Sequence, residues 1–212
     1  MKDIYIIAEI GINHNGDLEI AKKLIDIAKV AGCDVVKFQK RNPDICVPEH
    51  QKTVMRDTPW GRMTYLEYKY KVEFEKPEYD EIDQYCKSKG IQWTASPWDL
   101  DSLDFLNKYN VPFIKIPSAL ITDLDLIRKT TETGKKIIIS TGMSTMEEVD
   151  AAVNTIKDVN SIADFAVLHC NSSYPAPNDE LNLRCIQTLK DKYNCEVGYS
   201  GHEFGLTTTI AS

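Results

Sequence analysis

Residues 113–140, FIKIPSALITDLDLIRKTTETGKKIIIS, contain the pattern that decides the fold. A short apolar run from Phe113 to Ile116 is followed by a polar loop, by an amphipathic segment that closes near Gly134, and by a second apolar run from Lys136 to Ile139. Short β-branched runs predict buried strands, and the amphipathic segment between them predicts a helix. The stretch therefore predicts one strand–helix–strand unit with parallel strands.

The same pattern recurs along the whole sequence. Apolar runs predict seven strands, at 4–10, 35–38, 91–95, 113–116, 136–139, 165–168 and 196–199. The segments between them predict helices: one over 18–28 that ends at Gly32, one from Pro77 to Gly90, one capped by Asp99 or Asp101, one closing near Gly134, one with a capping box of Ser144 and Glu147, and one starting at Asn178 or Asp179. A further helix is expected from Leu206 onward.

Alternating strands and helices with short connections predict an α/β fold with a parallel sheet. A doubly wound sheet also fits the count, but polar residues cluster where every strand ends and not only at one switch point. We therefore predict a (β/α)8 TIM barrel, truncated after its seventh strand, because no eighth strand precedes Ser212. We expect the chain to be a fragment or a shortened form of a longer protein.

One connection between predicted elements is much longer than the others. Residues 40–77 form a 38-residue link, far above the roughly 5 residues that are usual in compact domains. The link contains a short helical pattern over 65–72. Long insertions at the end of a barrel strand typically cover a substrate, so we expect this segment over the mouth of the barrel.

Composition restricts the possible function classes. The chain has 212 residues, 27% of them charged, and a net charge of -7, which predicts no general binding of nucleic acid or of an anionic membrane. The N-terminal apolar run is interrupted by Glu9 and is far shorter than the roughly 20 residues of a membrane span. Six scattered cysteines without a C-x-x-C pair, and no visible signal peptide, predict a reduced, cytoplasmic protein.

Polar residues at the predicted strand ends indicate an anion site. They are Glu9, Lys37 with Gln39, Thr94 with Ser96, Lys115 with Ser118, Ser140 with Thr141, His169 with Asn171 and Ser172, and Ser200 with His202. In a parallel barrel these ends meet at one mouth, where two ammonium groups and several hydroxyls suit a small, multiply charged oxyanion. Structural roles are the alternatives: Glu9 as the ion-pair partner of Lys37 or Lys115, His169 as a hydrogen-bonded core residue, and His14 as part of the first turn.

Eight motifs in order resemble those of one enzyme family. They are IAEIGINHNGD (7–17), VVKFQK (35–40), the S-P at 96–97, IKIPSAL (114–120), ISTGMST (139–145), LHCNSSYPAP (168–177), NLRCIQTL (182–189) and VGYSGHEFGL (197–206). Together they resemble the sialic acid synthase family, which comprises N-acetylneuraminate synthases and their legionaminic and pseudaminic relatives. The resemblance extends from Ile7 to Leu206.

The resemblance implies a barrel enzyme that condenses phosphoenolpyruvate with an N-acylated hexosamine aldehyde, such as N-acetylmannosamine. It implies a divalent metal, Mn2+ or Mg2+, and release of phosphate together with a nonulosonic acid. By motif, the residues that match phosphoenolpyruvate contacts are Lys37, Ser96, Lys115, Ser118, Ser140 and Ser200. Glu9 matches a carboxylate near the sugar aldehyde and water, Gln39 and Tyr174 match sugar contacts, and His202 matches one of two metal-binding histidines. We expect Glu9, Lys37 and Lys115 to be catalytic.

Departures from the family pattern affect these expectations. Ser172 stands where the family often has Asn, so the phosphate contact passes to Ser172 or to Asn171. KIPSAL (115–120) lacks the carboxylate of the common K-I-x-S-G-E, and GYSGH (198–202) replaces the common GYSDH, as in the animal enzymes. The second metal histidine, the eighth strand–helix unit and the family's C-terminal antifreeze-like domain do not occur in the 212 residues, so we expect an incomplete barrel domain over 1–212 with weak metal binding.

The resemblance also implies a homodimer when the protein is full length, and no nucleic-acid or membrane partner. The sequence leaves open which sugar is the acceptor and whether that sugar carries a 6-phosphate. Two other functions remain as alternatives: a catalytically inactive remnant that binds ligand, and a Schiff-base aldolase that uses Lys115.

Overall fold

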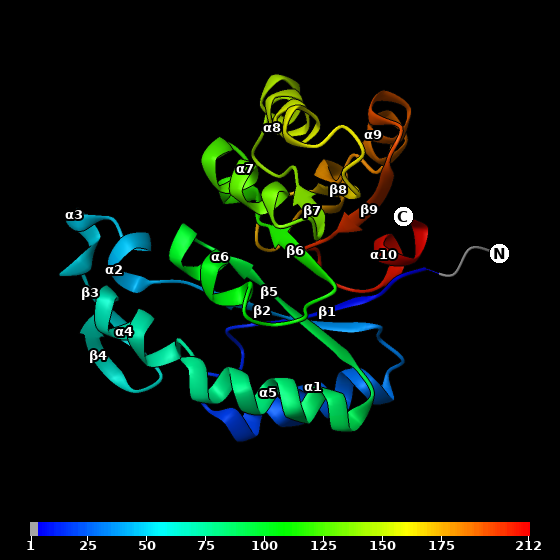
Figure 1. Cartoon of the computed structure of the whole chain (residues 1–212). Coiled ribbons are helices and arrows are strands. Elements are labelled where there is room, and N and C mark those ends of the chain that lie inside the picture. The colour runs from blue at the N-terminus through cyan, green and yellow to red at the C-terminus, as the bar shows by residue number, and fades with distance from the viewer. Residues whose placement is uncertain (1–3) are drawn as a thin grey trace. The chain divides into compact units, whose positions relative to one another are not determined.

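The computed structural model describes residues 4–212, and the chain divides into two compact units, Met1–Pro112 and Phe113–Ser212. In the first unit, β1 (Ile7–Gly11), β2 (Val35–Lys40) and β5 (Gln92–Pro97) form a parallel sheet in the order β1-β2-β5 (Figure 1). In the second, β6 (Phe113–Ile116), β7 (Lys136–Ser140), β8 (Phe165–Cys170) and β9 (Glu196–Ser200) form a parallel sheet in the order β6-β7-β8-β9. The predicted α/β fold with seven parallel strands is confirmed.

The strand order favours a barrel-type arrangement over a doubly wound sheet. A doubly wound sheet places an early strand in its interior and adds later strands on both sides. Here the spatial order of the parallel strands follows the sequence in each unit, and within residues 4–212 β1 pairs with β2 alone. Closure of all these strands into one truncated barrel stays a prediction.

Two helices cover one face of the first sheet. α1 (Leu18–Val30) and α5 (Lys76–Lys89) lie side by side against it (Figure 1), and the Asp17 carboxylate caps α1 by accepting hydrogen bonds from two backbone amides. Phe38 of β2 packs edge-on against Tyr79 of α5, with ring centroids 6.3 Å apart. Because side chains alternate along a strand, Lys37 and Gln39 project from the opposite face of β2.

The connection over 40–77 folds as a small substructure of the first unit. It comprises α2 (Pro43–Cys46), α3 (Glu49–Lys52), β3 (Met55–Thr58), β4 (Gly61–Thr64) and α4 (Tyr65–Val72). The predicted helix over 65–72 is confirmed, whereas the antiparallel β3–β4 hairpin was not predicted. Its strands are short, polar and largely exposed, so they lack the alternation that identifies a strand. Coverage of a substrate by this segment stays a prediction.

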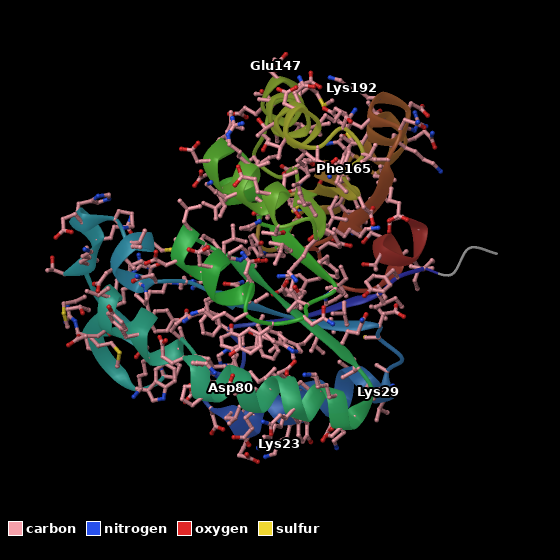
Figure 2. The ribbon with its side chains drawn as sticks, in the orientation of Figure 1. Lys23, Lys29, Asp80, Glu147, Phe165 and Lys192 are labelled. Atoms are coloured by element: carbon pink, nitrogen blue, oxygen red, sulfur yellow. The ribbon has the colours of Figure 1, made fainter. Side chains whose placement is uncertain are left out.

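Helices also cover one face of the second sheet. α7 (Leu124–Glu132), α8 (Met146–Val159) and α9 (Cys185–Tyr193) lie on the same side of β6 to β9 (Figure 1). Glu147 and Lys192 lie on the outer sides of α8 and α9 (Figure 2), and Lys192 forms a 2.7 Å ion pair with Asp150 of α8. Ile137, Ile139 and Val167 are fully buried on the helix-covered face. The alternate positions of these strands face the other way.

Helix ends at Gly32, Gly90 and Gly134 agree with the sequence, but the start of α8 does not. The capping box consists of Thr145 and Glu148, one residue later than the predicted pair. Ser144 is engaged elsewhere, because its hydroxyl donates to the Gly142 carbonyl at 3.0 Å. Both Ser144–Glu147 and Thr145–Glu148 satisfy the S/T-x-x-E pattern, so the sequence alone does not decide which pair forms the capping box.

Two further boundaries differ from the sequence prediction. The first strand begins at Ile7 and not at Ile4. The helix predicted from Asn178 or Asp179 is a single 3-10 turn, η2 (Asn178–Glu180), and α9 begins at Cys185. Asn182 has a left-handed φ of 47°, and the Leu181 carbonyl contacts His169 Nε2 at 2.6 Å, so a continuous helix cannot form through these residues. Two other short elements belong to the second unit. They are the 3-10 turn η1 (Ser118–Leu120) and the last helix, α10 (Thr207–Ala211).

All six cysteines are free thiols, as the sequence predicted for a protein without a disulfide framework. Within residues 4–212, every helix is too short or too polar to cross a membrane.

Candidate active site

The first unit brings three predicted residues into contact on three adjacent parallel strands. Lys37 of β2 forms an ion pair with Glu9 of β1, its register partner, and its ammonium donates to Ser96 Oγ of β5 at 3.2 Å. The Lys37 side chain is 6% exposed, whereas that of Glu9 is 50% exposed. A buried ammonium group requires a charged partner, so this ion pair stabilises Lys37 within the sheet while the carboxylate stays open to solvent. Of the two ion pairs considered for Glu9, the structure forms the one with Lys37.

Gln39 lies two residues beyond Lys37 on the same face of β2. A Cβ added to Gly11 would lie 3.1 Å from Glu9 Oε1 and 3.4 Å from Gln39 Nε2, so the absence of a side chain at Gly11 lets these two groups approach. Arg41 donates from its guanidinium to Gln39 Oε1. The Gln39 amide is thereby oriented with its carbonyl toward Arg41 and its NH2 group toward Glu9.

In the second unit, the register places four strand residues on one face of the sheet. Lys115 pairs with Ile138, two residues before Ser140, and Ser140 pairs with Leu168, two residues before Cys170, which pairs with Ser200. This face is opposite to the one that packs against α7, α8 and α9. Lys115 is 9% exposed and Ser140 is fully buried. The predicted residues Lys115, Ser140 and Ser200 therefore share one side of the sheet.

Gly142, just after β7, is the point on which the loops of this unit converge. Its amide donates to Ser118 Oγ at 3.0 Å. A Cβ added there would overlap Ser172 Oγ and lie 2.9 Å from Ser118 Oγ and 3.2 Å from Cys170 Sγ. Two predicted hydroxyls thus meet within a small volume that exists only because residue 142 is glycine.

Ser140 and Asn171 differ in how their side chains are used. Ser140 Oγ is buried and has no hydrogen-bond partner among residues 4–212. The Asn171 amide donates to the Glu180 carbonyl at 3.1 Å and accepts from Ser173 N at 2.9 Å. Because Asn171 is committed to its own loop, Ser172 is the better candidate for the phosphate contact, and the hydroxyl of Ser140 is free to bind a ligand.

His202 contacts Tyr174 and Cys170. Tyr174 OH is 2.8 Å from His202 Nε2, while Nδ1 is 2.6 Å from the Asn171 carbonyl and 3.8 Å from Cys170 Sγ. The hydrogen bond with Cys170 is the main cause that raises the pKa of His202, against the opposing effect of burial. Burial raises the pKa of Cys170, but hydrogen bonds with His202 and Ser118 outweigh it and lower the pKa overall. The two side chains stabilise each other's charged forms.

The residues around His202 do not by themselves fit a divalent metal. Both ring nitrogens already have protein partners, and within the described part of the chain no three His, Cys, Asp or Glu side chains are grouped as metal ligands. Mg2+ and Mn2+ are usually held by carboxylate oxygens, so one imidazole without such groups beside it is an incomplete site. His202 remains a predicted single ligand.

A pocket of about 660 Å³ lies in the second unit beside these loops. Its lining is largely uncharged and includes Thr141, Ser144, Asn171, Ser172, Thr188 and Leu189. Three lining residues, Ser144, Cys170 and Ser172, also lie close to Gly142. The pocket therefore borders the serine-rich face on the side of α8 and α9.

Two histidines have the structural roles that the sequence offered as alternatives. His169 is 9% exposed and contacts the Leu181 carbonyl at 2.6 Å. His14 accepts from Gly16 N at 3.1 Å in the first loop and stacks on Phe74, with ring centroids 3.9 Å apart. Burial lowers the pKa of His14 to about 4. Both interpretations are confirmed.

A sequence model of the NeuB family matches residues 24–212, which is most of the chain. The chain belongs to the NeuB family. This confirms the family that the ordered motifs indicated, and it places Lys37, Lys115 and the serine-rich loops within a known family of synthases.

Curated relatives cover the whole chain. It is 39% identical over 220 residues to the N,N'-diacetyllegionaminic acid synthase of Campylobacter jejuni, covering 100% of this chain and 64% of the relative. It is 41% identical over 212 residues to the N-acetylneuraminate-9-phosphate synthase of Drosophila melanogaster, covering 99% of this chain and 56% of the relative. The chain thus spans about three fifths of the length of these relatives.

A solved structure has the same fold. The N-acetylneuraminic acid synthetase of Leptospira borgpetersenii, crystallised in complex with citrate, superposes with a TM-score of 0.89 at 32% identity, over 99% of this chain and 69% of that one. The α/β fold with parallel strands therefore resembles that of a sialic acid synthase.

Sequence reasoning missed two residues of these clusters. Gly142 lies in a motif that the sequence contains, but its role follows from the convergence of three loops. Arg41 follows the KFQK motif and continues the alternation of Lys37 and Gln39, which is the signal that identifies it.

Proposed function

We propose that the protein containing this chain condenses phosphoenolpyruvate with an N-acylated hexosamine aldehyde, such as N-acetylmannosamine, to give a nonulosonic acid and phosphate. The observation that carries this proposal is the buried Lys37 ammonium held by Glu9 and Ser96 of the two neighbouring parallel strands. Glu9 is half exposed, so an anionic ligand has access to the pair. The names of the relatives support a nonulosonic acid as the product.

The proposed phosphoenolpyruvate contacts are cationic and hydroxyl groups. They are Lys37 and Ser96 in the first unit, and Lys115, Ser118, Ser140, Ser172 and Ser200 in the second. Lysines neutralise the carboxylate and phosphate charges, and hydroxyls donate to their oxygens. Each charge-assisted hydrogen bond contributes about 1.5 to 3 kcal/mol.

The proposed chemistry forms one carbon–carbon bond and one carbon–oxygen bond, and it breaks one carbon–oxygen bond. The enol carbon of phosphoenolpyruvate attacks the aldehyde carbon, and the aldehyde oxygen takes a proton. Water, oriented and deprotonated by Glu9, adds to C2, whose positive charge the bound phosphate and Glu9 stabilise. The bond between C2 and the bridging oxygen then breaks, so phosphate leaves with that oxygen. Gln39 and Tyr174 contact the acceptor in this scheme.

The same family resemblance supports three further proposals. His202 would be one ligand of a divalent metal, Mn2+ or Mg2+, which would supply a Lewis acid for the aldehyde. The described residues do not complete the coordination shell of such an ion. The full-length protein is a cytoplasmic homodimer.

Calorimetry with phosphoenolpyruvate tests the two lysines separately. Lys37→Ala and Lys115→Ala should each weaken binding by about 10- to 150-fold, the equivalent of 1.5 to 3 kcal/mol. Lys23→Ala, on the outer side of α1 (Figure 2), and Lys190→Ala in α9 are matched controls that should bind like the wild type. Unchanged affinity in Lys37→Ala would remove that lysine from the site and overturn the proposal's main support.

Isotope transfer tests the reaction. Phosphoenolpyruvate with 18O at the bridging position, given with N-acetylmannosamine or its 6-phosphate to the full-length protein, should deliver the label to phosphate. Label in the sugar acid would mean cleavage between phosphorus and oxygen. Borohydride trapping of pyruvate on Lys115 would support the aldolase alternative, and binding without turnover would support an inactive remnant.

A further inference from the structure

The face of β2 that carries Lys37 continues outward to a second cationic residue. Lys37, Gln39 and Arg41 alternate along one side of the chain, so Arg41 lies about 13 Å beyond Lys37 at roughly 3.3 Å per residue. β5 runs in register beside it, with Ser96 opposite Gln39. Trp98, two residues on, lies under the Arg41 guanidinium, whose carbon is 4.8 Å from a Trp98 ring centroid. For an acceptor sugar that contacts Gln39, Arg41 is therefore the next side chain along this side of the chain.

Arg41 is buried yet keeps hydrogen-bonding capacity. The residue is 4% exposed, and its Nε is buried without a hydrogen-bond partner among residues 4–212, since its ion-pair partner Glu73 is 4.0 Å away. Trp98 Nε1 is also buried and has no acceptor among the same residues. Two neighbouring donors without an acceptor are unusual in a protein interior and point to a ligand that accepts hydrogen bonds.

Two more cations of the 40–77 segment, Lys69 and Arg56, lie on one tyrosine ring, and the positive charge of Arg41 acts on Lys69. Lys69 of α4 extends along Tyr65, with its ammonium 5.0 Å from the ring centroid, and Arg56 of β3 stacks on the same ring at 3.8 Å. Burial, and next the positive charge of Arg41, lower the pKa of Lys69 to about 8. We call Arg41, Arg56 and Lys69 the Arg41 cluster.

Protein carboxylates compensate only part of this charge. Glu73 is the acidic side chain that faces both Arg41 and Lys69, but it also accepts from Lys40 Nζ at 3.3 Å and from Arg41 N at 3.0 Å. Burial raises the pKa of Glu73 in spite of these cations. Because Lys40 also shares Glu73, this carboxylate cannot neutralise Arg41, Arg56 and Lys69 together. The remaining positive charge suits a phosphate monoester, with its charge of about -2, better than a carboxylate.

We propose that Arg41 and Lys69 bind a phosphate monoester at the far end of the acceptor sugar, and so select a phosphorylated hexosamine over its neutral form. This inference rests on the proposed condensation for the identity of the sugar. Arg41 contacts the phosphate in a planar fork, while Trp98 and Gln39 hold its guanidinium in place. Lys69 adds a point charge from α4.

Calorimetry with two acceptors tests this selection. The full chain, saturated with phosphoenolpyruvate, is titrated with N-acetylmannosamine 6-phosphate and with N-acetylmannosamine. Lys69→Met should weaken the sugar phosphate by about 10- to 100-fold, while affinity for the neutral sugar and for phosphoenolpyruvate changes by less than about twofold. Arg41→Ala should weaken the sugar phosphate by a similar factor and the neutral sugar by much less, because Gln39 also loses the partner that orients its amide. Arg62→Ala, an exposed cation on β4 of the same segment, is the matched control and should leave all three affinities unchanged.

A measurement on the unsubstituted chain keeps the inference testable if Arg41→Ala fails to fold. Reductive methylation with 13C labels the lysines, and the Lys69 resonance reports its own titration. Saturation with the sugar phosphate should raise the pKa of Lys69 from about 8 toward its ordinary value, because an anion favours the charged form. Arg41→Lys should restore part of the affinity, since it keeps the charge and loses the fork.

The outcomes separate this inference from the proposed function. Sugar-phosphate affinity that is indifferent to Arg41→Ala, or an equal loss for both acceptors, would overturn the Arg41 subsite while leaving the condensation intact. Sugar-phosphate binding that depends on Arg41 in a chain that does not bind phosphoenolpyruvate would support the subsite and overturn the condensation.

Discussion

The two parallel sheets carry their predicted site residues in different ways. In the first unit the polar side chains bind one another: Lys37 forms an ion pair with Glu9, and Arg41 donates a hydrogen bond to Gln39. In the second unit uncharged hydroxyls converge on Gly142, and Ser140 Oγ has no partner among the described residues. Charge pairs hold the first cluster, whereas close packing of small groups holds the second. Substitutions should therefore affect charge and chemistry in the first unit and shape in the second.

Glu9→Gln should have the largest effect. The amide keeps the shape of the side chain but cannot take a proton from water, so turnover should fall by about 100- to 10,000-fold in the full-length protein. Phosphoenolpyruvate should bind as well or more tightly, because Lys37 no longer shares its charge with a carboxylate. Steady-state phosphate release and calorimetry measure the two effects.

A purely structural Glu9 would give the opposite result. If the carboxylate only compensates Lys37, Glu9→Gln would lower the melting temperature and leave turnover per folded molecule unchanged. Glu81→Gln on α5, at an exposed carboxylate that pairs with Lys22, would serve as the control for loss of one ion-paired carboxylate.

His14 should make the first unit sensitive to acid. Its pKa is about 4 in the folded chain, because of burial, against about 6.5 when unfolded. Between these values the unfolded chain binds more protons, so the free energy of unfolding should fall as the pH is lowered from about 7 to 4, by about 3 kcal/mol in total. All three tryptophans, Trp60, Trp93 and Trp98, belong to this unit, so urea unfolding followed by tryptophan fluorescence reports it.

The His14→Gln variant isolates this contribution. It should lose less stability between pH 7 and pH 4 than the wild type does, while His50→Gln, at an exposed position, should behave like the wild type. Equal acid sensitivity in His14→Gln and the wild type would show that other groups dominate.

Gly142→Ala should damage the second unit by shape alone. The new methyl group overlaps Ser172 Oγ and crowds Ser118 Oγ, so we expect a loss of about 1 to 3 kcal/mol in stability and weaker phosphoenolpyruvate binding. Gly134→Ala is the control: no atom lies within 4 Å of its new Cβ, and its cost is the left-handed backbone alone. Phosphoenolpyruvate affinity equal to that of the wild type in Gly142→Ala would show that the convergence has no part in binding.

A structural feature could be predicted from the sequence where local interactions determine it, and it was missed where contacts between distant residues determine it. Helix ends at Gly32, Gly90 and Gly134 depend on local backbone preferences, and they were predicted. The sequential parallel strands follow from apolar runs that tertiary packing reinforces. The β3–β4 hairpin was missed because its polar strands are defined by pairing with each other and not by burial.

The site residues also fall into two groups: those with a local signal in the sequence, and those whose role depends on contacts made on folding. Lys37 and Lys115 were recognisable because a lysine inside an apolar run is locally anomalous. The partner of Glu9 was not decided by the sequence, since strand register selects it. Arg41 acquires its role from Trp98 and Lys69, which reach it only after folding.

Ser140→Ala should have the smallest effect on stability and separates ligand binding from packing most cleanly. Because Ser140 Oγ is buried without a partner among residues 4–212, removing it should leave the free energy of unfolding unchanged or slightly higher. Phosphoenolpyruvate affinity should nevertheless fall by about fivefold, the equivalent of roughly 1 kcal/mol for one lost hydrogen bond. Thr130→Ala is the matched control, since its hydroxyl is equally buried and unpartnered among those residues but lies in α7, away from the serine-rich face. Equal affinities in Ser140→Ala and Thr130→Ala would mean that the orphaned hydroxyl of β7 is a packing defect and not a ligand contact, and Ser140 would then leave the set of phosphoenolpyruvate contacts of the second unit.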